Sequence, residues 1–485
     1  MKNDFTKEEW ETCIKVLQVL SRDPDKSLDT LSLKGLVTKL YKRAKKDNKQ
    51  QVADELLNKP AVSTQLLSLK KVQKLSQKQS LLKQYDKKVV LAQTAMHRKY
   101  ELPDTEDVPD AKEPLELAGY QRCYICKTPY KQVHFFYHML CPSCADVNYT
   151  RRHQQANLEG RVALITGGRI KIGYLTALRM LRDGAKVWVT TRFAKDCAMR
   201  FSQEADFAEW NHRLKIVALD LRNLAQLNSF IQYLQTQETH LDILINNAAQ
   251  TIKRPVAFYR HLFELEESDS DNLPEAVRQC IAFSTPFQFL TSSHEQQLLP
   301  YETATAFPAN RYDKDRQQVD LRTSNSWTMR LQEVPPGEML ETQLVNVTAP
   351  FMLNSQLKDM MIRSPFERRF IINVSAMEGQ FNRISKTPFH PHTNMAKAAL
   401  NMMTRTSAQE YAQDHIFMNS VDTGWITQEN PYPKKERLYE EEGFVPPLDE
   451  TDGMARIYDP VVRGINLPEL PLFGHFLKDY LPHAW

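Results

Sequence analysis

The stretch "RVALITGGRIKIGYLTALRMLRDG", residues 161–184, decides the fold of this chain of 485 residues. It begins with a short apolar run, which predicts a buried strand. The turn that follows contains Gly167, Gly168 and Gly173, and a helix is predicted directly after the turn. At such a turn a helix N-terminus and a close backbone approach can receive a pyrophosphate, so the stretch predicts a dinucleotide-binding site.

The alternation of apolar runs with helical segments continues along the chain. It predicts a doubly wound α/β fold, a Rossmann-type parallel sheet whose ligand lies at the carboxyl ends of the strands. We expect this domain to occupy residues 157–485, with a last strand and tail in "PLFGHFLKDYLPHAW". The intervening predicted strands are "AKVWVTTR" (185–192), "LKIVALD" (214–220), "LDILINNAA" (241–249), "RFIINVSA" (369–376) and "MNSVDTG" (418–424).

Charge is distributed unevenly, although the net charge of +4 is too small to indicate a partner. Residues 34–99 contain 17 Lys/Arg against 4 Asp/Glu, whereas residues 101–116 contain 7 acidic residues and one lysine. Residues 1–100 therefore predict a helical basic region, and the Pro-containing residues 101–117 an acidic linker. The first interpretation of these lysines is a solvated helix face. The alternatives are a protein partner bound through residues 1–150, and nucleic acid, which the lack of interleaved aromatic residues disfavours.

The N-terminal sequence and the cysteines bear on the compartment. No apolar run approaches the roughly 20 residues that a membrane span needs, so no membrane is expected. The opening "MKNDFTKEEWETC" has acidic residues and no apolar core, which is typical of neither a secretory signal nor a transit peptide. Seven cysteines in such a chain predict reduced thiols and a cytoplasmic location.

Four of the cysteines form two CxxC pairs in "CYICKTPYKQVHFFYHMLCPSC", residues 123–144. Each pair presents two thiolates on one side of a turn, and this spacing suits tetrahedral Zn(II). Four cysteine ligands leave no open coordination position, so the metal is expected to be structural. His134 and His138 are alternative ligands. The predicted module spans residues 118–152, with the ligands Cys123, Cys126, Cys141 and Cys144.

From about residue 158 to the C-terminus the sequence resembles the short-chain dehydrogenase/reductase family. The family's glycine motif corresponds to "TGGRIKIG", with Lys171 in place of the middle glycine, and its NNAG motif corresponds to "NNAA" at residues 246–249. The resemblance implies a nicotinamide dinucleotide as cofactor. The cofactor-binding residues that it and the glycine turn imply are Gly167, Gly168, Arg169, Gly173, Arg192, Asp220, Leu221, Asn247, Ala248, Lys397, Gly424 and Thr427.

The choice of cofactor depends on charge at the end of the second strand. An acidic residue there would bind a ribose 2′-hydroxyl and repel a 2′-phosphate. This chain has Arg192 at that point and a second cation, Arg169, in the glycine turn. Because the planar fork of arginine suits phosphate, NADP(H) is predicted over NAD(H).

The resemblance implies four catalytic positions, and two of them differ from the family pattern. Lys397 matches the lysine, and Asn346 the asparagine that supports a relay water. Thr393 stands where the tyrosine is expected, and Ala376 where the serine is expected, with Ser375 displaced by one residue. A threonine hydroxyl is far less acidic than a phenol, so Thr393 is a poor proton donor. His392 and His390 are alternative donors, because imidazole titrates in the right range.

These observations leave two functions open. The first is an atypical NADP(H)-dependent oxidoreductase acting on a carbonyl, alcohol or enone-type small molecule, with non-standard catalytic residues. The alternative is a catalytically impaired NADP(H)-binding sensor or scaffold that acts through its zinc and helical regions. Asn246 and Asn346 lie 100 positions apart, which exceeds the family's usual connection, so residues 253–336 predict an insertion that serves as a lid or interaction surface. A homo-oligomer is a further expectation.

Overall fold

The computed structural model describes residues 6, 12, 81–83, 85–101, 115–283, 305–383 and 386–485. The predicted helical basic region therefore lies mostly outside the described residues. Its described end contains η3 (Asp86–Val90), η4 (Leu91–Gln93) and α4 (Ala95–Glu101), and the extended Thr94, with ψ 149°, separates η4 from α4. Residues 82–485 form one compact unit, to which all the sites below belong. Among the described residues, no helix is both long enough and apolar enough to cross a bilayer.

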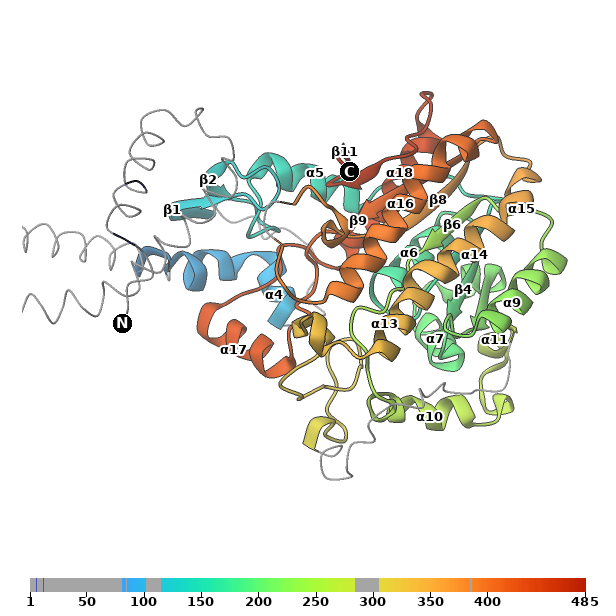
Figure 1. Ribbon diagram of the computed structural model, residues 1–485, viewed down its shortest axis with the longest axis horizontal. Coiled ribbons are helices and arrows are strands. Elements are labelled where there is room, and N and C mark those ends of the chain that lie inside the picture. Colours follow the sequence, from blue (N-terminus) through green and yellow to red (C-terminus); the bar gives the residue numbers. More distant parts are fainter. Residues whose placement is uncertain are drawn as a thin grey trace, which may run out of the picture. The chain divides into compact units, whose positions relative to one another are not determined.

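The core of this unit is a sheet in which nine described strands follow the order β11-β10-β9-β8-β6-β3-β4-β5-β7 (Figure 1). Neighbouring strands are parallel except for β10 and β11, which form a C-terminal hairpin. The predicted Rossmann-type parallel sheet is confirmed. The strands are β3 (Val162–Thr166), β4 (Lys186–Thr191), β5 (Leu214–Ala218), β6 (Ile243–Asn246), β7 (Ile281–Phe283), β8 (Arg369–Ser375), β9 (Ile416–Asp422), β10 (Phe476–Lys478) and β11 (Leu481–His483).

Helices cover both faces of the sheet because its strands bury side chains on both faces. In β3, Ala163 and Ile165 pack into one apolar cluster, whereas Val162 and Leu164 pack into another. The first cluster includes side chains of α6 (Lys171–Arg182), α7 (Ala194–Phe201), α11 (Glu275–Arg278) and α18 (Glu450–Asn466). The second includes side chains of α9 (Leu224–Gln237), α14 (Ala349–Gln356), α15 (Lys358–Ile362) and α16 (Pro391–Gln413).

The predicted insertion at 253–336 adds a strand to the sheet. Its β7 pairs with β5 at the sheet edge. Besides α11, the other described elements of the insertion are η6 (Val256–Tyr259), α10 (Arg260–Glu267), η7 (Ser270–Asn272), η8 (Ser326–Thr328) and η9 (Leu331–Glu333). Elsewhere in the domain lie α8 (Phe207–Trp210), η5 (Asn211–Arg213), α13 (Pro336–Gln343), η10 (Leu344–Thr348), η11 (Met377–Gly379) and α17 (Tyr432–Glu442).

The four-cysteine module consists of the antiparallel strands β1 (Leu115–Arg122) and β2 (Pro129–Val133), followed by α5 (Pro142–Arg152). The strand β1 begins inside the stretch predicted as linker. The helix α5 packs against α18 (Figure 1). The guanidinium of Arg152 in α5 donates to both carboxylate oxygens of Asp449, at 2.5 and 2.9 Å, and lies 3.2 Å from Asp452. These buried ion pairs join the module to the sheet domain.

Candidate active site

A cavity of about 1690 Å³ lies at the carboxyl ends of the parallel strands. It includes most of the predicted site residues, although these are scattered over some 260 positions of sequence. Of the predictions, Gly168, Asn346 and His392 are not among the described residues that line it. The predicted catalytic and cofactor-binding residues that do line it are Gly167, Arg169, Gly173, Arg192, Asp220, Leu221, Asn247, Ala248, Ser375, His390, Thr393, Lys397, Gly424 and Thr427.

The glycine turn is tightly packed between β3 and α6. A Cβ atom on Gly168 would lie 2.6 Å from Val189 Cγ1, and one on Gly173 would clash with the carbonyl oxygen of Gly167 and the amide of Asn247. Glycine is therefore required at both positions. Lys171, where the family has glycine, keeps the left-handed conformation of a glycine, with φ +55°. Its ammonium lies 3.8 Å from Asp315 and is partly exposed.

The two asparagines of "NNAA" have different tasks. Asn247 Nδ2 donates to the carbonyl oxygens of Thr166, at 3.0 Å, and Gly167, at 3.1 Å, so it holds the glycine turn. Asn246 is buried and donates to the side-chain oxygens of Asn354 and Asn373, both at 2.8 Å. The first asparagine therefore joins β6 to β8 and α14, and only the second shapes the cavity.

The two arginines predicted to select the cofactor are placed differently. Arg169 donates to Asp196 at 2.6 Å and to Gln317 at 2.7 Å, and it shares the Asp196 carboxylate with Arg200, which donates to it at 2.7 Å. Arg192 lies over the ring of Tyr259, 4.6 Å from its centroid, and donates to the hydroxyl at 2.8 Å. Tyr259 belongs to the insertion and lines the cavity as well. The insertion thus holds Arg192 at the end of β4.

A third arginine at this end of the cavity was not predicted. Arg222 donates to both carboxylate oxygens of Asp220, with its closest contact at 2.6 Å. Burial raises the pKa of Asp220, but the hydrogen bonds and charge of Arg222 outweigh it, so the net pKa is lowered and Asp220 is ionised at neutral pH. The sequence signal was available, since Arg222 directly follows the predicted pair Asp220 and Leu221.

Lys397 and Thr393 lie one helical turn apart on α16 and both face the cavity. Lys397 is buried and donates to the carbonyl oxygen of Val374 at 2.7 Å. Burial lowers the pKa of Lys397 to about 8. Thr393 is only 3% exposed, and its hydroxyl has no hydrogen-bond partner among the described residues. A buried hydroxyl without a partner is free to bond a ligand.

Three other predicted catalytic side chains have partners within the protein. The Asn346 amide exchanges hydrogen bonds with the backbone of Gln250, at 2.7 and 3.2 Å. The Ser375 hydroxyl donates to Asn401 at 2.6 Å. His392 is buried, with Nε2 3.5 Å from the carboxylate of Glu338. All three side chains therefore already have partners, and of the three only Ser375 lines the cavity together with Thr393.

His390, the other predicted alternative donor, does line the cavity. It begins α16 in a left-handed conformation, with φ +41°, and its ring stacks on Trp327 of the insertion, with centroids 3.9 Å apart. Its Nδ1 atom is buried without a hydrogen-bond partner among the described residues. Burial lowers the pKa of His390, so the imidazole is neutral at pH 7.

Two carboxylates at this end were not predicted as site residues. Glu378 lines the cavity, and its charge favours the protonated forms of Lys397 and His390. Asp422, at the end of β9, accepts from the backbone N–H of Met377 at 3.2 Å. Burial raises the pKa of Asp422 to about 6. Carboxylates are frequent in any sequence, and only the parallel pairing of β8 with β9 brings these two together.

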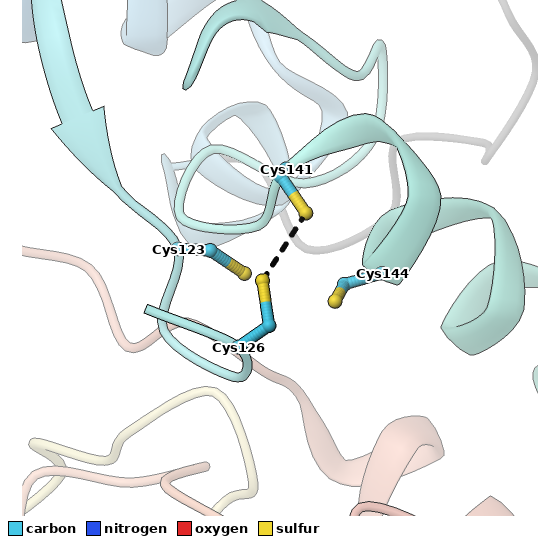
Figure 2. A group of neighbouring side chains, drawn as sticks. All are labelled: Cys123, Cys126, Cys141 and Cys144. Atoms are coloured by element: carbon cyan, nitrogen blue, oxygen red, sulfur yellow. Dashed lines mark hydrogen bonds between the residues drawn. The ribbon is translucent and has the colours of Figure 1, made fainter. Parts of the chain in front are cut away.

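The four predicted metal ligands form a cluster (Figure 2). Cys123 and Cys126 lie after β1, and Cys141 and Cys144 lie at the start of α5, with all four sulfur atoms within 4.8 Å of one another. A tetrahedral Zn(II) with Zn–S bonds of about 2.3 Å needs sulfur atoms roughly 3.8 Å apart, so the residues fit the metal.

The two histidines of the module have other contacts. His134 Nδ1 accepts from a backbone N–H at 3.1 Å, and His138 Nε2 lies 3.1 Å from the carbonyl oxygen of Val445. The four cysteines therefore remain the better ligand set for a metal at this cluster.

Comparison with known proteins agrees with this architecture. Residues 161–267 match the model of the short chain dehydrogenase family, and residues 323–443 match a second model, described as enoyl-(acyl carrier protein) reductase. The unmatched residues between them fall within the predicted insertion. The fold is a Rossmann-type domain, and the chain belongs to the short-chain dehydrogenase/reductase family.

Individual proteins are similar to this chain at identities of 19–38%. The chain is 32% identical over 361 residues to the uncharacterized protein R665 of Acanthamoeba polyphaga mimivirus, which is 72% of each chain. It is 38% identical over 95 residues to human dehydrogenase/reductase SDR family member 13, or 19% of this chain and 24% of that protein. Among solved structures, the Pseudomonas aeruginosa RhlG/NADP active-site complex has 19% identity and a TM-score of 0.42, covering 67% of this chain and 96% of that one.

Proposed function

We propose that this protein is an NADP(H)-dependent oxidoreductase acting on a carbonyl, alcohol or enone-type small molecule. The observation that carries the proposal is that the glycine turn, the ends of β4 and β5, and Lys397 all line one cavity. A bound dinucleotide would supply the hydride. The turn at Gly167 and Gly168, with the N-terminus of α6, would receive the pyrophosphate, and Lys397 would hold the ribose.

The charges at the ends of β4 and β5 favour a 2′-phosphate. Arg192 and Arg222 both line the cavity there, against one acidic group, Asp220. The carboxylate of Asp220 is already neutralised by Arg222. Arg192 is therefore the residue that we assign to the phosphate, with Tyr259 holding it in place.

Proton transfer would use the groups that face the cavity without a partner. Thr393 would bond the substrate oxygen, and His390 is a better placed donor than His392, whose ring lies against Glu338. Because the pKa of His390 is lowered, little of its imidazole carries the extra proton at neutral pH, and it is a poor general acid there. We therefore expect slow turnover.

A second candidate is an NADP(H)-binding sensor or scaffold. It is favoured by the hydrogen bond of Ser375 to Asn401 and by Ala376 beside it, which leave no serine hydroxyl at the family's position. In either case we propose a structural Zn(II) at the four cysteines, a cytoplasmic location, and a protein partner or second copy bound by the chain. Nucleic acid is the weaker alternative for residues 1–150.

Dinucleotide binding is tested first by quenching of NADPH fluorescence. We expect NADPH to bind at least tenfold more tightly than NADH, and Arg192→Ala to remove this preference, since charged hydrogen bonds contribute about 1.5–3 kcal/mol each. Arg182→Ala is the matched control, because that arginine pairs with Asp206 and Glu204 outside the cavity lining. Equal NADPH affinity in wild type and Arg192→Ala would contradict the assignment.

Catalysis is tested by NADPH consumption against a broad panel of carbonyls and enones. The oxidoreductase proposal predicts turnover of at least one class. Tight binding without turnover of any panel member would instead favour the sensor.

A further inference from the structure

The turn inside the first CxxC pair forms part of the dinucleotide cavity. Residues 124–127 line it together with the glycine turn and the loop after β9, residues 423–430. The four-cysteine module is therefore not a separate appendage, because its metal-binding loop is a wall of the site.

Tyr124 of this turn holds the loop after β9 directly. Its hydroxyl accepts a hydrogen bond from the backbone N–H of Trp425 at 3.0 Å. A Cβ atom on Gly424 would lie 3.8 Å from the same hydroxyl, and Gly424 has φ +82°. Gly424 and Thr427 in this loop are among the predicted cofactor-binding residues, so Tyr124 fixes a loop that we assign to the cofactor.

The apolar core of the module reaches both loops of the site. Ile426, in the loop after β9, is buried in that core together with Leu448, and Ile172 of the glycine turn packs against it. The same small core thus supports the two segments whose backbones would contact opposite parts of a bound dinucleotide.

The CxxC turn is held by its backbone as well as by its cysteines, because the N–H of Tyr124 donates to the carbonyl oxygen of Met139 at 2.8 Å and both Tyr124 and Ile125 pack against the core of the module. Backbone hydrogen bonds join Cys123 to Thr128, at 3.0 Å, and Lys127 to Cys123, at 3.2 Å. Cys126 is exposed, and Lys127 adopts a left-handed conformation, with φ +62°. The other end of the module is fixed by the ion pairs of Arg152. A metal bound to Cys123 and Cys126 would join the two ends of the turn that carries Tyr124, and would so add a constraint on its position to that of the backbone hydrogen bonds.

We propose that Tyr124 is a positioning residue of the dinucleotide site, and that Zn(II) in the four-cysteine cluster holds it there, so that metal and dinucleotide bind with positive coupling. The coupling rests on the proposed dinucleotide function. The positioning of the two loops by the metal does not. Coupling between two sites is reciprocal in binding free energy, which makes the proposal testable from either side.

The first experiment measures the coupling on the full chain. Removing zinc with a chelator is expected to weaken NADPH binding roughly fivefold or more. Saturating NADPH is expected to slow zinc transfer to a colorimetric chelator. Equal NADPH affinity with and without zinc, in protein that keeps its circular dichroism, would overturn the coupling.

The second experiment isolates the hydroxyl of Tyr124. Tyr124→Phe keeps the ring and is expected to retain one zinc per chain while weakening NADPH binding roughly two- to tenfold, the effect of one hydrogen bond. Tyr120→Phe is the control, because that side chain is 74% exposed on β1 and outside the cavity lining. Unchanged NADPH affinity in zinc-loaded Tyr124→Phe would overturn the positioning role.

Hydrogen exchange separates this inference from the proposed function. Zinc removal is expected to raise exchange in residues 166–173 and 423–427 but not in β5, residues 214–218. If the zinc-loaded chain failed to bind NADPH and these loops still responded, the positioning would stand and the dinucleotide proposal would fall. Unchanged loop exchange would overturn the positioning. If zinc removal unfolds the whole chain, the positioning role is tested on zinc-loaded Tyr124→Phe alone, by hydrogen exchange in the same two loops.

Discussion

The two ends of the cavity differ in how closely they keep the family pattern. At the dinucleotide end, Gly167 and Gly173 are tightly packed and Asn247 holds the turn. At the reactive end, threonine stands at the tyrosine position, and the hydroxyl of Ser375 is bonded to Asn401. Binding depends on backbone geometry spread over many strand ends, whereas proton transfer depends on a few side chains. Two substitutions can therefore alter the chemistry of a site and leave its binding framework in place.

The largest effect should come from returning the missing phenol. Thr393→Tyr places a phenol one helical turn from Lys397, whose charge would lower the phenol pKa. A positioned general acid contributes about 10²–10⁴-fold, so we expect NADPH consumption with a carbonyl panel to rise about 100-fold.

The control for this substitution is Thr393→Phe, which adds the same ring without the hydroxyl. If both variants bind NADPH and neither gains activity, a group other than position 393 limits the reaction. The reactive end would then be impaired beyond the loss of one residue.

Lys397 lies between the two ends of the cavity, and replacing it should weaken NADPH binding while changing the free energy of unfolding in the opposite direction. Lys397→Met is expected to weaken NADPH binding at least tenfold, because a ribose contact is lost. Burial lowers the lysine pKa from 10.5 to about 8, so the unfolded chain binds more protons than the native one between these values. Stability of the wild type therefore rises with pH through this window, and below pH 8 the native state carries a penalty of about 3 kcal/mol.

The variant loses that penalty but leaves the carbonyl group of Val374 without its donor, at a cost of about 1–3 kcal/mol. We expect Lys397→Met to be about 1 kcal/mol more stable at pH 7, measured by urea unfolding. The gain should disappear near pH 10. The stability difference between Lys397→Met and wild type should favour the variant more at pH 7 than at pH 10. The opposite order would contradict the predicted direction of the pH dependence.

The sequence predicted the binding end far better than the reactive end. The strands from "RVALIT" to "MNSVDTG" are local apolar runs. The carboxyl ends of parallel strands lie at the same edge of the sheet, independent of the length of the loops between them. Contacts made across the insertion have no local signal. Arg192 meets Tyr259, 67 positions away, and His390 stacks on Trp327. The edge strand β7 has only three residues, too few to show a period in the sequence.

A smaller effect tests whether the insertion helps to choose the cofactor. Tyr259→Phe keeps the ring under Arg192 but removes the hydroxyl that accepts its hydrogen bond. One such bond is worth about 1 kcal/mol, so NADPH affinity should fall roughly threefold to fivefold and NADH affinity should not change. Equal losses for both dinucleotides, measured by fluorescence titration, would show that Tyr259 supports the site as a whole and does not act through the 2′-phosphate.

The smallest effect concerns Lys171, the position at which the glycine motif of this chain departs from the family pattern. A non-glycine residue in the left-handed region costs about 1 kcal/mol, and glycine recovers part of this while adding entropy to the unfolded chain. The ion pair with Asp315, at 3.8 Å and partly exposed, contributes little.

We therefore expect Lys171→Gly to gain about 0.5 kcal/mol in urea unfolding. NADPH binding is the more informative readout, because Lys171 lines the cavity at the pyrophosphate turn. If its ammonium meets a phosphate, affinity should fall about twofold to threefold and depend less steeply on salt. Unchanged affinity and salt dependence would mean that the lysine only fills a glycine position, and the binding end would then follow the family pattern without an added contact.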